Sequence, residues 1–313
     1  MAYLRSGSMR RLSAALFFLL LCSACTGPAR EEAGTLPARF PAVDRIVAIG
    51  DLHGDLEATR EALRLAGAID EEDRWIGGQL VLVQTGDQLD RGGDELEILD
   101  LLERLAEEAE RAGGAVHVLN GNHELMNAYL DLRYVTEEGF ADFQEAFPVT
   151  EPDSLLRTFE PSRRSRAAAF RPGGPVALRL ARRNTAVIIG DNLFVHGGIL
   201  PEQVDRGLER MNEAIRSWLR GEEPQPEWVR GESSPVWSRH YSSRPDEEDA
   251  ALLDEVLDRL DVERMVVGHT VQDGGVAAYC DARVWCIDTG MAEHYGGPIR
   301  ALEIMGDRVR VLR

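Results

Sequence analysis

Residues 45–55 read Arg-Ile-Val-Ala-Ile-Gly-Asp-Leu-His-Gly-Asp. The apolar run 45–49 is typical of a short buried strand. Glycine follows at once, and Asp51 and His53 come directly after it, with side chains that bind metals or move protons. Glycine permits the sharp backbone turn that such an abrupt change requires. The stretch therefore predicts a buried strand that ends in a chemically active turn.

The same unit recurs four times along the chain. Strands are predicted at 80–83, 116–119, 186–195 (two strands joined at 190–192) and 264–267, and the glycine-marked turns that follow them lie at 86–92, 121–124, 196–198 and 268–270. Helical spacing predicts helices at 56–66, 94–112, 201–220 and 247–260, and hairpins are expected at 276–287 and 300–312. This alternation predicts an α/β fold with helices on the sheet faces. Because ligands bind beyond the carboxyl ends of strands in such folds, we expect the five turns to meet at one pocket.

Six oxygen or nitrogen donors occupy these turns: Asp51, His53, Asp87, Asn122, His196 and His269. A catalytic zinc with an open position takes three protein ligands, so six donors suit two divalent cations instead. Such ions lie about 3.5–4 Å apart in hydrolytic sites and share a ligand. We expect the first two residues on one ion, the last three on the other, and Asp87 bridging both. A hydroxide bridging the ions would be the nucleophile, while the ions polarise a phosphoryl oxygen.

Three further residues in the same turns suggest how the reaction is completed. His123 follows Asn122 directly, and histidine is the usual donor of the proton that a leaving alkoxide needs. Asp90 is the expected partner that orients His123 and keeps it protonated. Arg91 adjoins Asp90, and its planar guanidinium group would hold phosphate oxygens. The turns thus predict a general acid, its partner and a phosphate clamp.

The composition narrows the class of protein. Among 313 residues there are 54 acidic and 35 basic side chains, which gives a net charge of −19. Every basic residue is arginine, which excludes a P-loop, a kinase-type ATP lysine and a pyridoxal Schiff base. The acidity argues against a broad nucleic-acid surface, so we expect no nucleic-acid partner. Fixed cationic recognition of a substrate falls to arginine.

Residues 1–25 have the pattern of an export signal. Two arginines precede an apolar stretch, 12–22, that is too short to span a bilayer. The small residues before Cys25 resemble a bacterial lipoprotein cleavage site, at which this cysteine would be lipidated; the alternative is an ordinary cleaved signal. We expect an exported protein in the periplasm or cell envelope, with membrane attachment through Cys25. Residues 26–43, rich in proline and glycine, are predicted to be a flexible tether.

The ordered turns resemble the motifs of a known family. The relevant stretches are Asp51-x-His53-Gly54, Gly86-Asp87-x-x-Asp90-Arg91-Gly92, Gly121-Asn122-His123-Glu124, His196-Gly197-Gly198 and Gly268-His269. They are similar to the signature of the phosphoprotein phosphatase branch of calcineurin-like metallophosphoesterases. Three stretches, Gly50 to Asp55, Asp90-Arg91-Gly92 and Trp237-Ser238-Arg239, look closest to the bacterial and plant Shewanella-like protein phosphatases. The resemblance spans roughly residues 44–290, nearly all of the chain that follows the predicted tether.

This resemblance carries expectations of its own. It implies a four-layer α/β/β/α sandwich, with residues 44–313 as the catalytic domain. It implies hydrolysis of phosphomonoesters on serine or threonine, with tyrosine as a further substrate, and two divalent ions (manganese, iron or zinc). It also implies the ligand and acid roles assigned above. By the same comparison, Arg239 is a second candidate for holding the phosphate.

Several alternatives remain open from the sequence alone. One is a hydrolase of dinucleoside polyphosphates or other small phosphoesters, although those enzymes typically carry Asn where Asp90 stands. Another is an inactive metal-binding adaptor, which would need neither His123 nor Arg91. Cys280 and Cys286 are either a disulfide or two separate thiols. The basic run 163–183 is either a collar that guides substrate or, as its composition favours, a solvated face.

Overall fold

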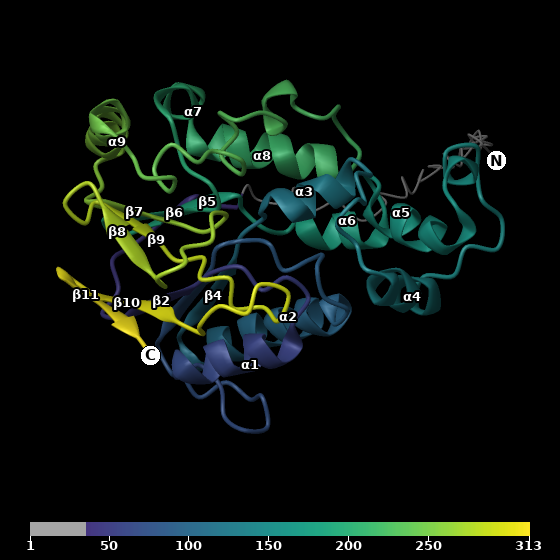
Figure 1. The fold of residues 1–313 in the computed structure, drawn as a ribbon, viewed down its shortest axis with the longest axis horizontal. Helices are drawn as coiled ribbons and strands as arrows, with labels where there is room; N and C mark the ends of the chain where they lie inside the picture. Colours follow the sequence, from purple (N-terminus) through teal and green to yellow (C-terminus); the bar gives the residue numbers. More distant parts are fainter. Residues whose placement is uncertain (1–35) are drawn as a thin grey trace, which may run out of the picture. The chain divides into compact units, whose positions relative to one another are not determined.

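Two mixed β-sheets lie at the centre of the structure, a computed structural model that describes residues 36–313. Figure 1 shows the sheets face to face, with helices on their outer sides. The six-stranded sheet contains, in spatial order, β1 (Arg39–Phe40), β5 (Ala186–Ile189), β6 (Asn192–Val195), β7 (Arg264–Val267), β9 (Val284–Cys286) and β8 (Ala277–Tyr279). The five-stranded sheet contains β11 (Arg308–Leu312), β10 (Ala301–Met305), β2 (Ile46–Ile49), β3 (Val81–Gln84) and β4 (Ala115–Val118).

The helices fall into three groups. The five-stranded sheet is covered by α1 (Leu56–Leu65) and α2 (Glu95–Ala112), and the six-stranded sheet by α7 (Pro201–Arg206), α8 (Leu208–Leu219) and α9 (Glu247–Leu260). A helical group beside the sheets contains α3 (Asn122–Ala128), α4 (Glu137–Ala146), α5 (Arg164–Phe170) and α6 (Pro175–Leu180), with the short helices η1 (Leu156–Thr158), η2 (Pro161–Arg163) and η3 (Glu227–Val229). Among the described residues, no helix has the length and apolarity that a membrane span requires.

Three apolar clusters separate the layers and explain why the strands are continuous apolar runs. In β2, Ile46 and Ala48 face the other sheet, whereas Val47 and Ile49 pack against α1 and α2. The cluster between the two sheets also contains Phe194, which belongs to the six-stranded sheet. A third cluster lies between that sheet and its outer helices. A strand buried on both faces needs apolar residues at every position, and the four-layer sandwich implied by the resemblance is confirmed.

The topology places the ends of several strands at one edge. Strands β2, β3 and β4 run parallel to one another. In the other sheet, β6, β7 and β9 are also parallel. The carboxyl ends of parallel strands share an edge, so each sheet contributes a row of loops on one side.

The structure changes two predicted boundaries. The helix predicted at 201–220 is two helices, α7 and α8, because Gly207 between them has a φ of 86°, which a continuous helix does not permit. The flexible tether predicted at 26–43 is wrong for its last part: Ala38 is buried, and Arg39–Phe40 pairs with β5. The export signal predicted at 1–25, including Cys25, lies outside the described residues.

The two predicted hairpins are present. Strands β8 and β9 pair antiparallel within 276–287, and β10 pairs with β11 within 300–312. Cys280 and Cys286 are both free thiols, so the disulfide alternative is not adopted. Cys286 is buried at the end of β9, where its Sγ atom contacts the carbonyl of Tyr241 at 3.7 Å.

Candidate metal centre

Five loops meet at the edge where the two sheets adjoin. Loops after β2, β3 and β4 leave one sheet, and loops after β6 and β7 leave the other. Backbone hydrogen bonds tie neighbours together: His53 N–H donates to the Asp87 carbonyl at 3.0 Å, and Gly268 N–H donates to the His196 carbonyl at 2.8 Å. The structure therefore brings all six predicted donors into one buried cluster.

Several of these residues have left-handed backbone conformations that residues other than glycine rarely adopt. The φ angles of His53, Asp87 and His269 are 47°, 58° and 66°. Each such residue costs on the order of 1–3 kcal/mol and persists only where the surrounding structure imposes it. At Gly121, a Cβ atom would collide with the side chain of Asp87. The loops are thus shaped to present side chains rather than to minimise strain.

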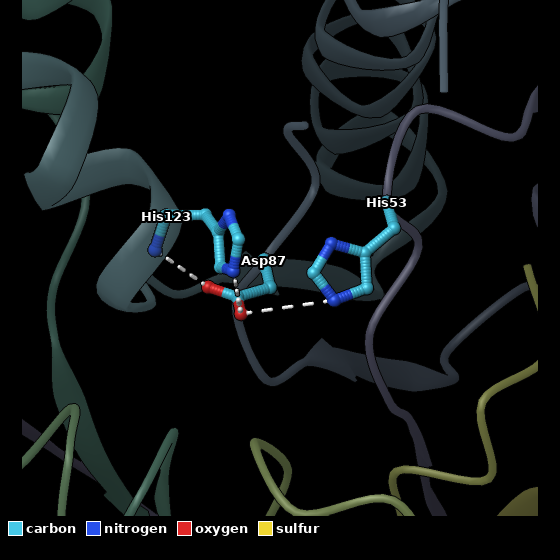
Figure 2. Close-up of side chains that lie close together, drawn as sticks. All are labelled: His53, Asp87 and His123. Carbon is cyan, nitrogen blue, oxygen red and sulfur yellow. Dashed lines mark hydrogen bonds and ion pairs between the residues drawn. The ribbon is translucent and has the colours of Figure 1, made fainter. Parts of the chain in front are cut away.

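Asp87 lies at the centre of the cluster. Its Oδ2 atom is 3.9 Å from His53 Nε2, 3.8 Å from His123 Nε2 and 3.2 Å from His196 Nε2. Figure 2 shows Asp87 between the first two of these rings. Burial acts to raise the pKa of Asp87, but the imidazoles, His196 first, outweigh it and hold this pKa well below its ordinary value. Asp87 is therefore ionised, and its Oδ2 atom lies near the ring nitrogens of three histidines.

Backbone carbonyls orient two of the imidazoles. His53 Nδ1 lies 3.0 Å from the Leu89 carbonyl oxygen, and His196 Nδ1 lies 3.0 Å from that of Thr85. A carbonyl oxygen only accepts hydrogen bonds, so the shared proton belongs to Nδ1, and Nε2 is the ring nitrogen that faces the cluster. Metal-binding histidines are held in this way by their other nitrogen.

Three electron-rich atoms approach one another around His196. Its Nε2 atom lies 2.8 Å from Asn122 Oδ1 and 3.2 Å from Asp87 Oδ2. Asn122 Nδ2 contacts Met126 Sδ at 3.8 Å, so the amide oxygen is the atom that faces His196. Ligand atoms at right angles on one ion, with bonds of about 2.1 Å, lie about 3 Å apart. The three atoms therefore have the spacing of ligands to a shared cation.

An unpartnered nitrogen also fits a cation. Within residues 36–313, the buried Nε2 atom of His269 has no hydrogen-bond partner. His269 forms a group with Asp87 and His196 whose ligand atoms all lie within 4.8 Å of one another. Burial, followed by the charges of His196 and Arg239, lowers the pKa of His269 well below its ordinary value. The neutral ring has a lone pair to share.

Asp51 is a second buried carboxyl group of the cluster, and it lies beside His53. Its Oδ2 atom lies 3.9 Å from His53 Nε2, and His269 N–H donates to its two oxygens at 3.3 and 3.2 Å. Burial, followed by the charges of Asp288 and Asp87, raises the pKa of Asp51 well above its ordinary value. Buried carboxylates that repel each other are stabilised by cations. The donor set as a whole fits a centre of two divalent ions.

His123 is held in a different way from the other histidines. Its Nδ1 atom lies 2.6 Å from Asp90 Oδ2, and both residues are buried. Burial lowers the pKa of His123, but the charges of Asp87 and Asp90 outweigh it and raise this pKa to about 9. A protonated imidazole beside the cluster has the state and position required of a general acid.

The two predicted phosphate-binding arginines lie near Tyr134 and line different cavities. The Arg91 guanidinium stacks 4.0 Å from the centre of the Tyr134 ring and lines a cavity of about 290 Å³ with His53. Arg239 lines another cavity, of about 380 Å³, together with Tyr134 and Trp237. The Tyr134 ring is also 5.2 Å from the His123 ring. Both arginines therefore border spaces that adjoin the cluster.

The sequence does not indicate two buried residues of the site. Asp288 is buried and follows β9, which is parallel to β7, so it lies in a strand-to-turn unit like the others. In the sequence, the stretch before it predicts a hairpin, and this interpretation hides the unit. Arg166 belongs to the basic run 163–183, yet it is fully buried, so neither a collar nor a solvated face describes it. It contacts Asp90 at 2.9 Å, and no local pattern announces this contact.

Comparisons of sequence agree with this geometry. The profile of the calcineurin-like phosphoesterase family matches residues 44–273. Shewanella-like protein phosphatase 2 of Arabidopsis thaliana is 43% identical over 290 residues, with 82% of this chain and 74% of that protein covered. Shewanella-like protein phosphatase 1 of Plasmodium berghei is 29% identical over 282 residues, with 86% and 74% covered.

Solved structures give the same result. A cold-active protein tyrosine phosphatase superposes with a TM-score of 0.73 at 27% identity, covering 88% of this chain and 78% of that one. The cold-active protein tyrosine phosphatase of a psychrophilic Shewanella species gives 0.72 at 26% identity, with 89% and 83% covered. On this combined evidence, the chain belongs to the calcineurin-like phosphoesterase family and is a metal-dependent hydrolase of phosphoric esters.

Proposed function

We propose that this protein removes phosphate from phosphorylated side chains of other proteins. The observation that carries the proposal is the His123–Asp90 pair, held at 2.6 Å beside the cluster of metal-binding side chains. An inactive adaptor would bind metal without needing this pair. The relatives named as protein phosphatases support this substrate class over small phosphoesters.

Each donor has a specific role in this proposal. Asp51 and His53 would hold one ion, and Asn122, His196 and His269 would hold the other. Asp87 would be shared between the two groups. When bound, the two ions supply an activated water and polarise a phosphoryl oxygen. Manganese, iron and zinc all accept this mixture of nitrogen and oxygen ligands, in which no cysteine takes part.

The other residues of the site act on the phosphoryl group and the leaving group. Arg91 binds the phosphate oxygens through its guanidinium fork. Arg239 contributes a second positive charge from the neighbouring cavity. His123 gives its proton to the leaving oxygen, and Asp90 keeps the ring in place during the transfer. Since phosphate esters of serine, threonine and tyrosine all need this proton, the acid serves each of them.

The cavity beside the site favours a bulky leaving group. It is lined by Tyr134, Trp237 and Arg239 and has a volume of about 380 Å³, large enough for an aromatic side chain. Aromatic rings pack well against tyrosine and tryptophan. We therefore include phosphotyrosine among the substrates, together with phosphoserine and phosphothreonine.

Phosphate release from matched peptides tests the proposal. The full chain is assayed, after metal removal and after addition of manganese, with peptides carrying phosphotyrosine, phosphoserine or phosphothreonine, and with diadenosine tetraphosphate. A His123→Asn variant is run in parallel. Metal-dependent release from peptides that collapses in the variant supports a protein phosphatase. A preference for the dinucleotide would assign the protein to small phosphoesters, and no release with any metal would favour the adaptor.

We further propose that the protein is exported and attached to a membrane through a lipid on Cys25. The support is the sequence of residues 1–25 alone. Labelling of the protein with a fatty-acid analogue in a bacterial host, for the native chain and for Cys25→Ser, tests the lipid. Loss of label in the variant is expected; equal label in both would contradict it.

A further inference from the structure

A fully buried arginine lies behind the His123–Asp90 pair. Arg166 is on α5, and its side chain is 0% exposed. Its Nη2 atom donates to Asp90 Oδ1 at 2.9 Å. His123 uses the other carboxylate oxygen, Oδ2. Arg166 and His123 therefore hold the same carboxylate through different oxygens.

Two further residues connect Arg166 to the acid. Its Nε atom donates to Asn127 Oδ1 at 2.7 Å. The Asn127 amide nitrogen in turn donates to Asp90 Oδ1 and to the His123 carbonyl, both at 3.0 Å. Arg166 thus reaches Asp90 directly and, through Asn127, also reaches the backbone of His123. The contacts form a closed network in which a shift of one member displaces the others.

Glu95 supplies the balancing charge. It accepts from Arg166 Nη2 at 2.8 Å and pairs with Nη1, and it also accepts from the backbone N–H of Asp90. That backbone has a φ of 65°, a conformation that needs external support. Asp90 and Glu95 are both fully buried. Because both carboxylates contact the same guanidinium group, they lie close enough to repel each other. The guanidinium between them removes the repulsion that would turn Asp90 away from His123.

The surroundings explain why this residue is an arginine. The rings of Phe143 and Phe170 lie 4.6 and 4.9 Å from its guanidinium carbon, and they exclude water from the network. Guanidinium is weakly hydrated, stacks on aromatic faces and offers donors in a fixed plane. An ammonium group in its place would be a single point of charge and could not hold three partners in that plane.

We propose that Arg166 is a positioning residue for the reaction: it fixes the Asp90 carboxylate so that the His123 ring points its Nε2–H at the leaving oxygen. The inference rests on the proposed role of His123 as general acid. As the oxygen of the attacking water bonds to phosphorus, the bond from phosphorus to the leaving oxygen breaks. Its electron pair passes to the leaving oxygen, which takes the proton from His123 Nε2. Arg166 takes no part in the covalent change. Helix α5 thereby contributes to catalysis through a buried side chain that does not contact substrate.

The test compares two esters that differ in their need for a proton. Phenyl phosphate leaves as a basic phenoxide, whereas 2,4-dinitrophenyl phosphate leaves as a stable anion. The variants are Arg166→Lys, the charge-balanced double variant Arg166→Met with Glu95→Gln, and His123→Asn. Arg216→Lys is the matched control, because Arg216 is also buried but pairs with Glu213 and Asn184. All are assayed in the presence of manganese.

The expected result is a selective loss. Arg166→Lys and the double variant lower kcat for phenyl phosphate about 10-fold to 100-fold, as loss of an outer partner does elsewhere, and change kcat for the dinitrophenyl ester little. His123→Asn shows the same selectivity more strongly, and Arg216→Lys shows none. Equal losses on both esters, or no loss, in the Arg166 variants would overturn the inference while leaving His123 as the acid. Unselective loss in His123→Asn would overturn the proposed acid as well.

A second measurement does not depend on activity. The Nδ1 proton of His123, shared with Asp90 over 2.6 Å, gives a downfield proton NMR signal that His123→Asn identifies by its loss. In folded Arg166→Lys this signal shifts or broadens, because the carboxylate is no longer fixed. An unchanged signal would show that Asp90 keeps its place without Arg166 and would contradict the inference.

Discussion

His196 Nε2 lies 2.8 Å from Asn122 Oδ1, although the two residues follow strands of different sheets. His196 comes after β6 of the six-stranded sheet, and Asn122 comes after β4 of the five-stranded sheet. Asp87 Oδ2 is 3.2 Å from the same nitrogen, so three candidate ligand atoms gather at this edge. An ion at this point would hold the two sheets together at their shared edge, so metal binding and stability are coupled.

The first prediction concerns this coupling. Manganese added to the metal-free protein raises its melting temperature, since a ligand at 100 times its Kd adds about 2.7 kcal/mol to the free energy of unfolding. His196→Ala lowers the bound manganese from two ions per chain to one and reduces the stabilisation. Differential scanning fluorimetry and metal analysis provide the two measurements. His240→Ala, an exposed histidine paired with Asp249, is the control and keeps both properties. Unchanged metal content in His196→Ala would contradict the ligand assignment.

The second prediction concerns recognition of phosphate. Arg91→Ala lowers kcat/KM for phosphopeptides about 10-fold to 100-fold, because it removes a charged hydrogen bond worth about 1.5–3 kcal/mol. Its metal content does not change, since Arg91 lines the cavity with His53 without being a ligand. Steady-state kinetics and metal analysis check both statements. Arg244→Ala, an exposed arginine in another loop, serves as the control. A loss of metal in Arg91→Ala would mean that the residue supports the centre rather than the substrate.

Much of the fold and of the metal cluster was predictable, because both depend on short-range patterns. A strand such as β2, buried on both faces, needs an unbroken apolar run, and the candidate ligand Asp51 follows that run after one glycine. These patterns involve neighbouring residues and are therefore visible in the sequence. The pairing of β1 with β5 is different, since Arg39 and Phe40 find partners about 149 residues away, at Ile188 and Ile189.

Arg166 shows why other parts of the site were not predictable. Its partners Asp90 and Glu95 precede it by 76 and 71 residues, and only the packing of α5 brings them together. A buried arginine also looks the same in sequence as the solvated arginines around it. Asp288 is an intermediate case, because its strand-to-turn pattern is local but the hairpin of β8 and β9 offers a competing interpretation.

The third prediction concerns the choice of substrate. Trp237→Ala lowers kcat/KM for a phosphotyrosine peptide about 10-fold more than for the matched phosphoserine peptide, because an aromatic pair contributes about 0.5–1.5 kcal/mol beyond burial of its area. Trp237 lines the cavity that also contains Arg239 and Tyr134. Kinetics on the two peptides measure the ratio. Trp285→Ala, a tryptophan on β9 outside this cavity, is the control. Equal losses on both peptides would show that the phosphotyrosine ring binds outside this cavity.

The fourth prediction concerns stability at low pH. His117 lies on β4, with its ring 4.4 Å from that of Phe40, and burial lowers its pKa from 6.5 to about 4. Between these values the unfolded chain binds a proton that the folded chain does not, so stability falls as the pH drops from 6.5 toward 4. The difference of about 2.5 pKa units corresponds to at most about 3–4 kcal/mol. His117→Phe keeps the contact with Phe40 but cannot bind a proton, and it therefore loses less stability over this range. Urea unfolding of both proteins at pH 7 and pH 4.5 measures the effect, and parallel losses would show that His117 is not the group responsible.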